Sequence, residues 1–336
     1  MVCREAESAL HGVSLREFGP PDALEFGALP DPVPRDGWVT VELRAAALNW
    51  HDCLVRQGVY ADVPLPRVLG ADGAGVRRDT GEDVVILPSL RWGDDERAPA
   101  PSWEILGDYT DGTYAELVAV PVENLYAKPR NWSWTAAAAL PLAGLTAYRA
   151  LFSRGHLHSG ETVLVLGAGG GVASIAIGLA AIAGARVLAT SSSSEKLALA
   201  RSLGAAGGAL YTEPAWPEEI RALSGGDGVD LVIDSVGSTW PDSLAALRPG
   251  GRLVAFGATG SARAEVDVRR FYFGQHTILG TTMGSPRDFA SLLSMLDEAP
   301  GWRPAIDSIR TLDRAHEAHA AMERPGHTGK LVLSIP

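Results

Sequence analysis

Residues Thr162–Lys196 read TVLVLGAGGGVASIAIGLAAIAGARVLATSSSSEK, and this stretch decides the fold of the part of the chain around it. An apolar run breaks into a glycine-rich turn, a helix of small residues follows, and a second β-type run comes roughly 20 residues later. This order of strand, turn, helix and strand is typical of a dinucleotide site, because glycines let the backbone approach a pyrophosphate and the helix start offers free N–H groups. The turn residues expected to contact the cofactor are Gly167, Gly169, Gly170, Gly171 and Val172.

The end of the second run indicates which dinucleotide is bound. Arg186–Thr190 is followed by hydroxyls and an ammonium rather than by a carboxylate. A carboxylate would accept from the ribose 2′-OH of NADH, whereas hydroxyls and a lysine suit a 2′-phosphate. We therefore predict NADP(H), with the 2′-phosphate held by Ser191, Ser192, Ser193 and Lys196.

Composition excludes several function classes. The chain has 336 residues, 46% of them hydrophobic, and a formal net charge of −11, which argues against nucleic acid or an anionic membrane as partner. No apolar run is long enough to span a membrane, and no signal peptide is evident. Two cysteines, Cys3 and Cys53, provide no disulfide framework. These features favour a cytoplasmic enzyme acting on a small molecule.

The pattern of elements changes along the chain. Residues 13–130 are β-rich, and from about 135 helices alternate with short strands. Six β runs predict a Rossmann-type doubly wound parallel six-stranded sheet: 162–166, 186–190, 209–212, 231–235, 252–257 and 277–282. Helices are expected at 134–153, 172–184, 195–203, 217–223, 238–247, 287–298 and 312–323. The final strand, GKLVLSIP, is expected to return to the N-terminal β domain.

Three motifs carry a family resemblance. Asn49–Tyr60 has the spacing N-x-x-D-x-x-x-R-x-G-x-Y, Leu69–Gly75 reads LGADGAG, and Leu140–Ala147 reads LPLAGLTA. Together with the tail motifs Ile278–Gly284 and Gly329–Leu333, they resemble the medium-chain dehydrogenase/reductase superfamily, in its zinc-free quinone oxidoreductase-like branch. The resemblance implies a GroES-like, partly open β-barrel domain (1–132 and 275–336) beside a Rossmann NADP-binding domain (133–274).

The resemblance also implies roles at the acceptor. Asn49 is expected near the nicotinamide, where its amide can donate to a developing oxyanion. Tyr60 stands where related enoyl thioester reductases have a proton-donating tyrosine, with a packing role as the alternative. The pocket beside them is expected to include Leu54 and, from the long loop 88–113, Trp92.

The strand ends and the family resemblance imply further cofactor contacts. Three of these assignments have an alternative without a cofactor: Tyr211 as an ordinary core residue, the glycines as plain turns, and Lys330 as a solvated lysine. Asp52 and Arg56, four residues apart, are expected to pair with each other. The expected contacts are Thr146, Tyr211, Ser235, Val236, Gly237, Phe256, Gly257, Ala258, Thr281 and Lys330.

Zinc is not expected. Zinc-dependent relatives have a cysteine at the position of Asn49 and a His-Glu pair where this chain has Ala71 and Asp72. A catalytic zinc needs about three protein ligands, and Cys53 with His51 does not supply them. Without a Lewis acid, reduction of an electron-poor acceptor is favoured over oxidation of a simple alcohol.

We therefore predict an NADPH-dependent, zinc-independent oxidoreductase that transfers hydride to a quinone or conjugated carbonyl. The alternatives are an enoyl-thioester reductase and a non-catalytic NADPH-binding sensor or structural protein. The resemblance implies a homodimer formed through the nucleotide domains.

Overall fold

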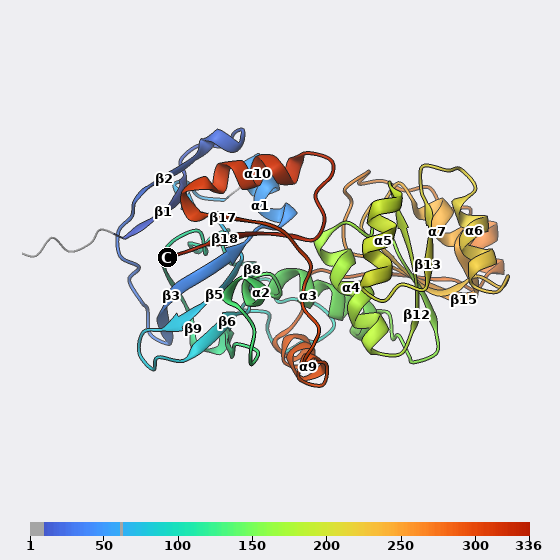
Figure 1. Ribbon diagram of the computed structural model, residues 1–336, viewed down its shortest axis with the longest axis horizontal. Helices are drawn as coiled ribbons and strands as arrows, with labels where there is room; N and C mark the ends of the chain where they lie inside the picture. Colours follow the sequence, from blue (N-terminus) through green and yellow to red (C-terminus); the bar gives the residue numbers. More distant parts are fainter. Residues whose placement is uncertain (1–9, 61–62) are drawn as a thin grey trace, which may run out of the picture. The chain divides into compact units, whose positions relative to one another are not determined.

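The computed structural model describes residues 10–60 and 63–336, so that Cys3 lies outside the described part. The chain forms two compact units. Unit 1 combines the residues up to Leu142 with Ile306–Pro336, and unit 2 is Ala143–Ala305 (Figure 1). Within the described residues, no helix combines the length and the apolar character needed to cross a membrane.

Unit 2 is built on a parallel sheet of six strands in the order β13-β12-β11-β14-β15-β16. The order reverses beside β11, the strand that precedes the glycine turn, as in a doubly wound fold. The central strands are almost entirely apolar because helices cover both faces of such a sheet. All six predicted runs are confirmed: β11 (Thr162–Val165), β12 (Arg186–Ser191), β13 (Gly207–Leu210), β14 (Val229–Asp234), β15 (Leu247–Ala255) and β16 (Thr277–Gly280).

Helices α4 and α5 pack on β11, β12 and β13, whereas α6 and α7 pack against each other and on β13, β14 and β15. Helix α8 precedes the edge strand β16 and was not expected from the sequence. Their bounds are α4 (Gly171–Ile182), α5 (Ser194–Ser202), α6 (Trp216–Leu223), α7 (Trp240–Ala246), α8 (Val268–Phe273) and α9 (Pro286–Asp297).

The single helix predicted over 134–153 is wrong. The structure has α2 (Trp134–Ala138), a break, α3 (Pro141–Tyr148) and a π-helical turn, η3 (Arg149–Arg154). Pro141 explains the break, because proline lacks the N–H that a helix interior requires and disfavours helical backbone at the residue before it.

Unit 1 is mostly β-structure. A seven-stranded sheet has the order β10-β6-β5-β3-β18-β17, with β9 also paired to β3, and smaller sheets join β2-β1-β4 and β7-β8. The strands are β1 (His11–Leu15), β2 (Leu24–Ala28), β3 (Trp38–Ala47), β4 (Arg67–Val68), β5 (Asp72–Arg77), β6 (Asp83–Ile86), β7 (Ser89–Leu90), β8 (Glu104–Ile105), β9 (Leu117–Pro121), β10 (Leu125–Ala127), β17 (Ile306–Thr311) and β18 (Lys330–Ser334).

The C-terminal strand returns to the N-terminal part of the chain, as predicted. In β18, Leu333 pairs with Ala46 of β3 in an antiparallel ladder. Strand β17 was not predicted and pairs in parallel with β18. The helices of unit 1 are η1 (Pro21–Ala23), α1 (Trp50–Arg56), η2 (Val122–Asn124), α2, η4 (Leu312–Arg314) and α10 (Ala315–Glu323).

The division into units differs from the sequence boundaries at 133 and 275. Helix α2 packs on β3 and β5 and so belongs with unit 1. Strand β16 pairs with β15, and α9 is tied by the buried ion pair between Arg149 and Asp288, so 275–305 belong with unit 2.

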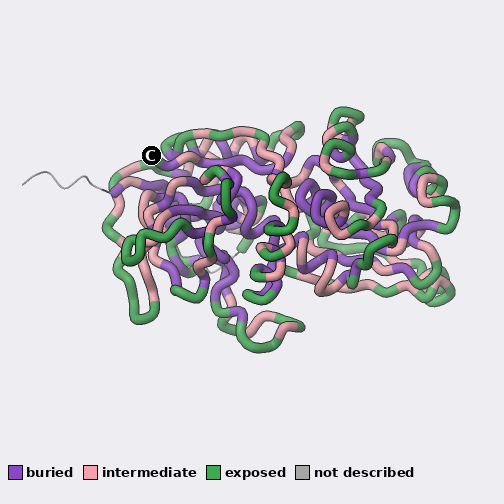
Figure 2. The backbone as a smooth tube through the Cα atoms, turned by 60° about the horizontal axis from the view of Figure 1, so that its bottom comes forward, coloured by how far each residue is buried: buried purple, intermediate pink, exposed green. Residues whose placement is uncertain are grey.

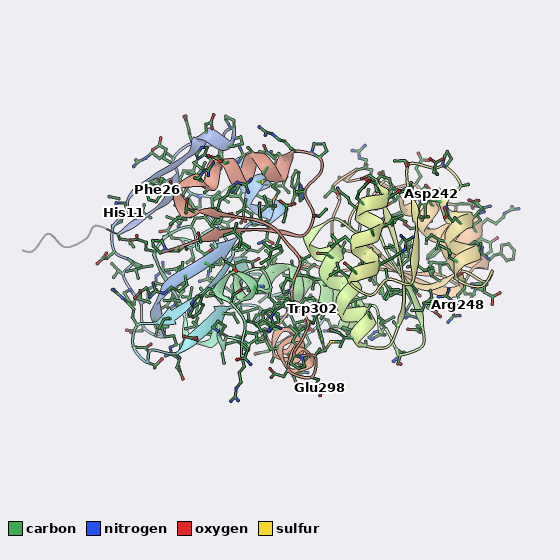
Figure 3. The ribbon with its side chains drawn as sticks, viewed as in Figure 1. His11, Phe26, Asp242, Arg248, Glu298 and Trp302 are labelled. Carbon is green, nitrogen blue, oxygen red and sulfur yellow. The ribbon has the colours of Figure 1, made fainter. Side chains whose placement is uncertain are left out.

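Each unit has its own apolar core. Figure 2 shows buried backbone through the strands and exposed turns around them. In unit 1 the core includes Leu43 and Leu333, and in unit 2 it includes Leu164 and Val232. At the margin of unit 1 the rings of His11 and Phe26 stack across β1 and β2, with centroids 5.6 Å apart (Figure 3).

Candidate active site

The carboxyl edge of the parallel sheet gathers most of the predicted cofactor residues. Adjacent strand ends are joined there by backbone hydrogen bonds, such as Tyr211 N–H to Ser191 O at 3.0 Å and Thr281 N–H to Ala255 O at 2.9 Å. Ligands of open parallel sheets bind at this edge. The groups that follow the six strands are 167–172 after β11, 191–193 after β12, Tyr211 after β13, 235–237 after β14, 256–258 after β15 and Thr281 after β16.

The glycine turn after β11 is open to a ligand. Gly167 has a φ of +70°, and no heavy atom lies within 4 Å of where its Cβ would be. The Gly170 N–H donates to Gly167 O at 2.9 Å, and α4 begins at Gly171. The N–H groups of the first helical turn, including that of Val172, have no partner within the helix. This geometry fits an anionic pyrophosphate.

Lys196 lies against this turn. A Cβ on Gly169 would be 2.8 Å from Lys196 Cδ and 3.3 Å from its Nζ. Ser193 is the N-cap of α5 and accepts from the Lys196 N–H, while Ser191 is buried and Ser192 is exposed. The structure therefore brings the lysine of the serine-rich segment to the glycine turn, as a phosphate site requires.

Asp234 organises the next turn and was not identified from the sequence. Its Oδ1 accepts from the N–H groups of Val236 and Gly237 at 2.7 and 3.2 Å. Its Oδ2 accepts from the Thr239 and Ser243 hydroxyls at 2.7 and 2.9 Å. A buried acid at a strand end, followed by small and hydroxylated residues, was the available signal.

The remaining predicted contacts of unit 2 differ in exposure. Tyr211 is 46% exposed, so the alternative of a core tyrosine does not hold. Phe256 is partly buried, and the two residues after it are exposed. Thr281 has a buried hydroxyl with no hydrogen-bond partner among the described residues, which a bound ligand would satisfy. Thr146 is 5% exposed and lies in α3.

Asn49 and Lys330 belong to unit 1, where they meet Asp72 in a buried cluster. Lys330 Nζ donates to Leu48 O at 2.7 Å, to Asn49 Oδ1 at 2.6 Å and to Asp72 Oδ2 at 2.9 Å. Asn49 Nδ2 donates to the same Asp72 oxygen at 2.9 Å. Asp72 Oδ1 accepts from the Leu142 N–H at 2.7 Å. Lys330 is 2% exposed, which excludes the alternative of a solvated lysine.

This cluster does not fit a catalytic zinc. The Lys330 ammonium already neutralises Asp72, so a divalent cation bound to that carboxylate would be repelled by the lysine. Among residues 10–60 and 63–336, no group of three or more His, Cys, Asp or Glu side chains is arranged to hold a metal ion.

Two polar side chains meet beside Tyr60 in unit 1. His51, in the first turn of α1, has Nε2 2.8 Å from Asp108 Oδ1, and their side chains are 14% and 15% exposed. The Tyr60 ring lies over His51 with centroids 5.0 Å apart and is 46% exposed. Leu54, on the same helix, is partly exposed. His51 and Asp108 are 57 residues apart in the chain, and their pairing could not be identified from the sequence.

The expected pair between Asp52 and Arg56 is wrong, because each has other partners. Asp52 Oδ2 accepts from the Asn49 N–H at 2.8 Å and from the Tyr114 hydroxyl at 3.0 Å. Arg56 donates to Gly19 O and pairs with Glu323. The helical spacing is right, but the buried carboxylate is used to cap α1.

A buried chain of polar groups continues from Asp52. His319 has Nε2 3.3 Å from the Tyr114 hydroxyl and Nδ1 3.5 Å from Cys53 Sγ. Burial raises the pKa of Asp52 to about 6, although the His51 charge and two hydrogen bonds oppose the shift. Burial lowers the pKa of His319 to about 3, helped by the charge of Arg56.

Trp92 is 2% exposed and packs edge-on against Trp103, with ring centroids 6.0 Å apart. Its indole N–H donates to Asp95 O at 3.2 Å. In the structure Trp92 is thus part of the core of the loop 88–113, rather than an open pocket wall.

Comparison with known proteins gives concordant results for both units. Residues 35–130 match the alcohol dehydrogenase GroES-like domain family, and residues 171–298 match the zinc-binding dehydrogenase family. The zinc-type alcohol dehydrogenase-like protein C1773.06c of Schizosaccharomyces pombe is 33% identical over 318 residues, covering 89% of this chain and 91% of that protein. The quinone oxidoreductase of Homo sapiens is 27% identical over 339 residues, covering 98% and 99%.

Solved structures agree over nearly the whole chain. The crystal structure of an NAD-dependent alcohol dehydrogenase has a TM-score of 0.90 and 38% identity, covering 97% of this chain and all of that one. A crotonyl-CoA carboxylase/reductase has a TM-score of 0.89 and 25% identity, covering 98% and 88%.

Proposed function

Since the chain belongs to the medium-chain dehydrogenase/reductase superfamily and is an oxidoreductase of that family, we propose that it uses NADPH, without zinc, to reduce a quinone or conjugated carbonyl. The observation that carries this proposal is the buried cluster of Lys330, Asp72 and Asn49. The positive charge in this cluster is the Lys330 ammonium and not a zinc ion that could act as a Lewis acid. Chemistry that depends on a metal-bound alkoxide is then disfavoured.

The carboxyl edge of unit 2 supports the cofactor assignment. A bound nicotinamide dinucleotide would supply the hydride. The glycine turn and the start of α4 would hold its pyrophosphate. The bound cofactor would also give the Thr281 hydroxyl a hydrogen-bond partner. Lys196 would bind the 2′-phosphate together with Ser192 and Ser193, because its ammonium lies beside Gly169.

Asn49 would stabilise the acceptor. A carboxamide nitrogen has two N–H groups, and one of them is held by Asp72. The other would donate to oxygen charge that develops as hydride arrives. The Lys330 contact fixes which end of the amide is the oxygen, because an ammonium can only donate.

The same proposal assigns the cofactor to unit 2 and the acceptor contacts to unit 1. We also propose that the protein forms a homodimer through unit 2. A cytoplasmic location remains a prediction from composition.

The test follows NADPH absorbance in EDTA with a quinone, a conjugated enal and an enoyl thioester offered separately. Oxidation that depends on the quinone or enal is the expected result. Loss of activity after EDTA dialysis, restored by zinc, would refute zinc independence. Binding of NADPH without turnover on any acceptor would instead favour a sensor or structural role.

Cofactor preference is tested with Lys196→Ala. We expect a roughly tenfold or greater loss of NADPH affinity with little change for NADH, since one charge-assisted contact to phosphate is removed. Arg201→Ala removes another cation from the same helix, α5, and serves as the control. An equal loss for both nucleotides would contradict the assignment of Lys196, which matters because one structural relative is named NAD-dependent.

An enoyl-thioester reductase is the second candidate. Tyr60 lies in the turn that follows α1 and is 46% exposed, as a proton donor would need to be. The similarity to a crotonyl-CoA carboxylase/reductase points the same way. Turnover of the thioester but not of the quinone or enal would select this reading.

A further inference from the structure

The pair of His51 and Asp108 has the features of a functional dyad. Its Nε2–Oδ1 distance is 2.8 Å, and both side chains are mostly but not completely buried. His51 lies in the first turn of α1, the helix that Asn49 caps. The exposed ring of Tyr60 covers the imidazole. Neither residue of the dyad has a role in the function proposed above.

Hydride transfer to an activated acceptor produces an anion that must then be protonated. Hydride addition delivers two electrons and one hydrogen, so an enone becomes an enolate and a quinone becomes a hydroquinone anion. Either anion needs an acid within reach at neutral pH. Asn49 can stabilise the negative oxygen, but a carboxamide has no proton to give up at that pH.

We propose that His51, held by Asp108, is the acid that protonates the reduced acceptor, an inference that rests on the proposed reductase function. The nicotinamide is oxidised as its hydride forms the new C–H bond, and the π electrons of the acceptor move to its oxygen. The His51 N–H bond then breaks, and its proton bonds to that oxygen. Neutral imidazole remains and is reprotonated by water.

The surroundings of His51 favour its protonated form. Burial by itself lowers the pKa of His51, but the hydrogen bond and charge of Asp108 and the charge of Asp52 outweigh burial and raise it. Tyr60, the other titratable group against the ring, is uncharged over this range because burial and the charge of Asp108 raise its pKa. Among residues 10–60 and 63–336, the titratable groups found to act on the imidazole are therefore Asp108, Asp52 and Tyr60, and none of them is positive.

In the reduction of a quinone or conjugated carbonyl proposed above, His51 is a better acid than Tyr60. A phenol whose pKa is raised above 10 gives up a proton less readily than an imidazolium does at pH 7. Tyr60 is better described as a positioning residue that covers the His51 ring.

The kinetic test compares His51→Gln and Asp108→Asn with the wild type in kcat/KM against pH. The wild type should lose activity as pH rises through the pKa of His51, because only the imidazolium is an acid. His51→Gln should lose about 10²-fold at neutral pH and lose this descending limb. Asp108→Asn should move the limb to lower pH by about one unit, because the anion that stabilises the imidazolium is gone. His158→Gln, at an exposed histidine of unit 2, is the control.

Folding and cofactor binding are checked separately by circular dichroism and by NADPH fluorescence titration, which neither variant should change. An NMR titration of the imidazole resonances tests the dyad without turnover. His51 should titrate above its ordinary pKa in the wild type and lower in Asp108→Asn.

The outcomes separate the two proposals. If the wild type turns over and folded His51→Gln keeps the same rate and pH profile, solvent supplies the proton and the inference is wrong, while the reductase function stands. If the wild type reduces no acceptor, the reductase function fails and the role of His51 fails with it. An imidazole that titrates below its ordinary value would also overturn the dyad.

Discussion

Lys330 is a cation buried in unit 1, and its contribution to stability depends on its three hydrogen-bond acceptors. The ammonium is satisfied by Leu48 O, Asn49 Oδ1 and Asp72 Oδ2, all within 2.9 Å. Removing one partner of a buried ion pair leaves the other charge without compensation, which costs far more than the pair itself contributes. The cluster therefore couples the orientation of a proposed catalytic amide to the stability of the unit.

Lys330→Met should destabilise the protein by about 3–5 kcal/mol, because the Asp72 carboxylate stays buried without its ammonium. The measurement is urea unfolding at pH 7. Lys196→Met is the matched control, since that lysine is partly exposed and should change stability by less than about 0.5 kcal/mol. The double variant Lys330→Met with Asp72→Asn should recover part of the loss. If Lys330→Met is as stable as the wild type, the ion pair with Asp72 does not contribute to stability as described.

Single residues were the least predictable level of this chain. The sequence suggested Lys330 as a cofactor contact, but 258 residues separate it from Asp72, and no local pattern reveals their pairing. The same holds for His51 and Asp108, which converge only through folding. Gly167, Gly169 and Lys196 could be predicted as cofactor contacts because they lie in a local turn and an adjacent helix, and this assignment stays a prediction.

At the scale of elements, periodicity identified the structures that bury one continuous surface. The six strands of unit 2 are short apolar runs bounded by turns, and all were found. Helix α1 was missed because Trp50–Arg56 is seven residues long and contains three polar or charged residues, His51, Asp52 and Arg56. Helix α8 was missed because none of its residues is buried, so no apolar stripe marks it.

The turn after β14 shows how one element depends on glycine. Gly237 has a φ of +85°, and a Cβ there would lie 2.0 Å from Ser261 O. Gly225 has a φ of +97°, but nothing lies within 4 Å of where its Cβ would be. The two glycines therefore share a left-handed conformation and differ in the space around them.

Gly237→Ala should thus cost more than Gly225→Ala. The control should lose about 1–2 kcal/mol from left-handed strain alone, and Gly237→Ala should lose a further 1–3 kcal/mol, roughly, from overpacking. Only Gly237→Ala should also weaken NADPH binding, because its turn lies at the carboxyl edge of the sheet. Thermal unfolding and NADPH titration of both variants provide the measurement, and equal effects would contradict this account.

For the whole molecule, two buried groups give opposing pH dependences of stability. His319 has a folded pKa of about 3, below its ordinary 6.5, so its contribution is present above pH 6.5 and is lost as pH falls toward 3. Asp52 has a folded pKa of about 6, above its ordinary 3.8, so its contribution is present below pH 3.8 and is lost as pH rises through 6. Between about pH 4 and 6 the two cancel.

Asp52→Asn should remove that cancellation. The amide oxygen can still accept from Tyr114, so the fold is kept, and the contribution of His319 is left unopposed. The free energy of unfolding of the variant in urea, relative to that of the wild type, should then rise with pH between pH 4 and 6, by up to ~1.4 kcal/mol per pH unit. His319→Gln should show the opposite slope. Parallel curves for all three proteins would show that neither group titrates as assigned.

The surface proposed for the homodimer contact is the edge of the unit 2 sheet formed by β16. Among the described residues, β16 pairs with no strand other than β15, and its far edge, where Gly280 O accepts from Arg154 Nε at 3.1 Å, is one that another strand can bind. Helix α8, immediately before it, exposes Val268, Tyr272 and Phe273 by 69%, 51% and 72%. A two-fold axis at this edge would bring the same strand and the same aromatic residues of two copies together.

Phe273→Asp should therefore convert a dimer into monomers in sedimentation velocity, because it introduces a charge into an apolar contact that each copy provides once. Ile309→Asp is the control: Ile309 is 53% exposed on β17, an edge strand of unit 1, and its replacement should leave the dimer intact. NADPH binding should survive in both variants, since the carboxyl edge of the sheet is untouched. A wild type that sediments as a monomer, or a Phe273→Asp variant that remains dimeric, would show that this surface is not the contact.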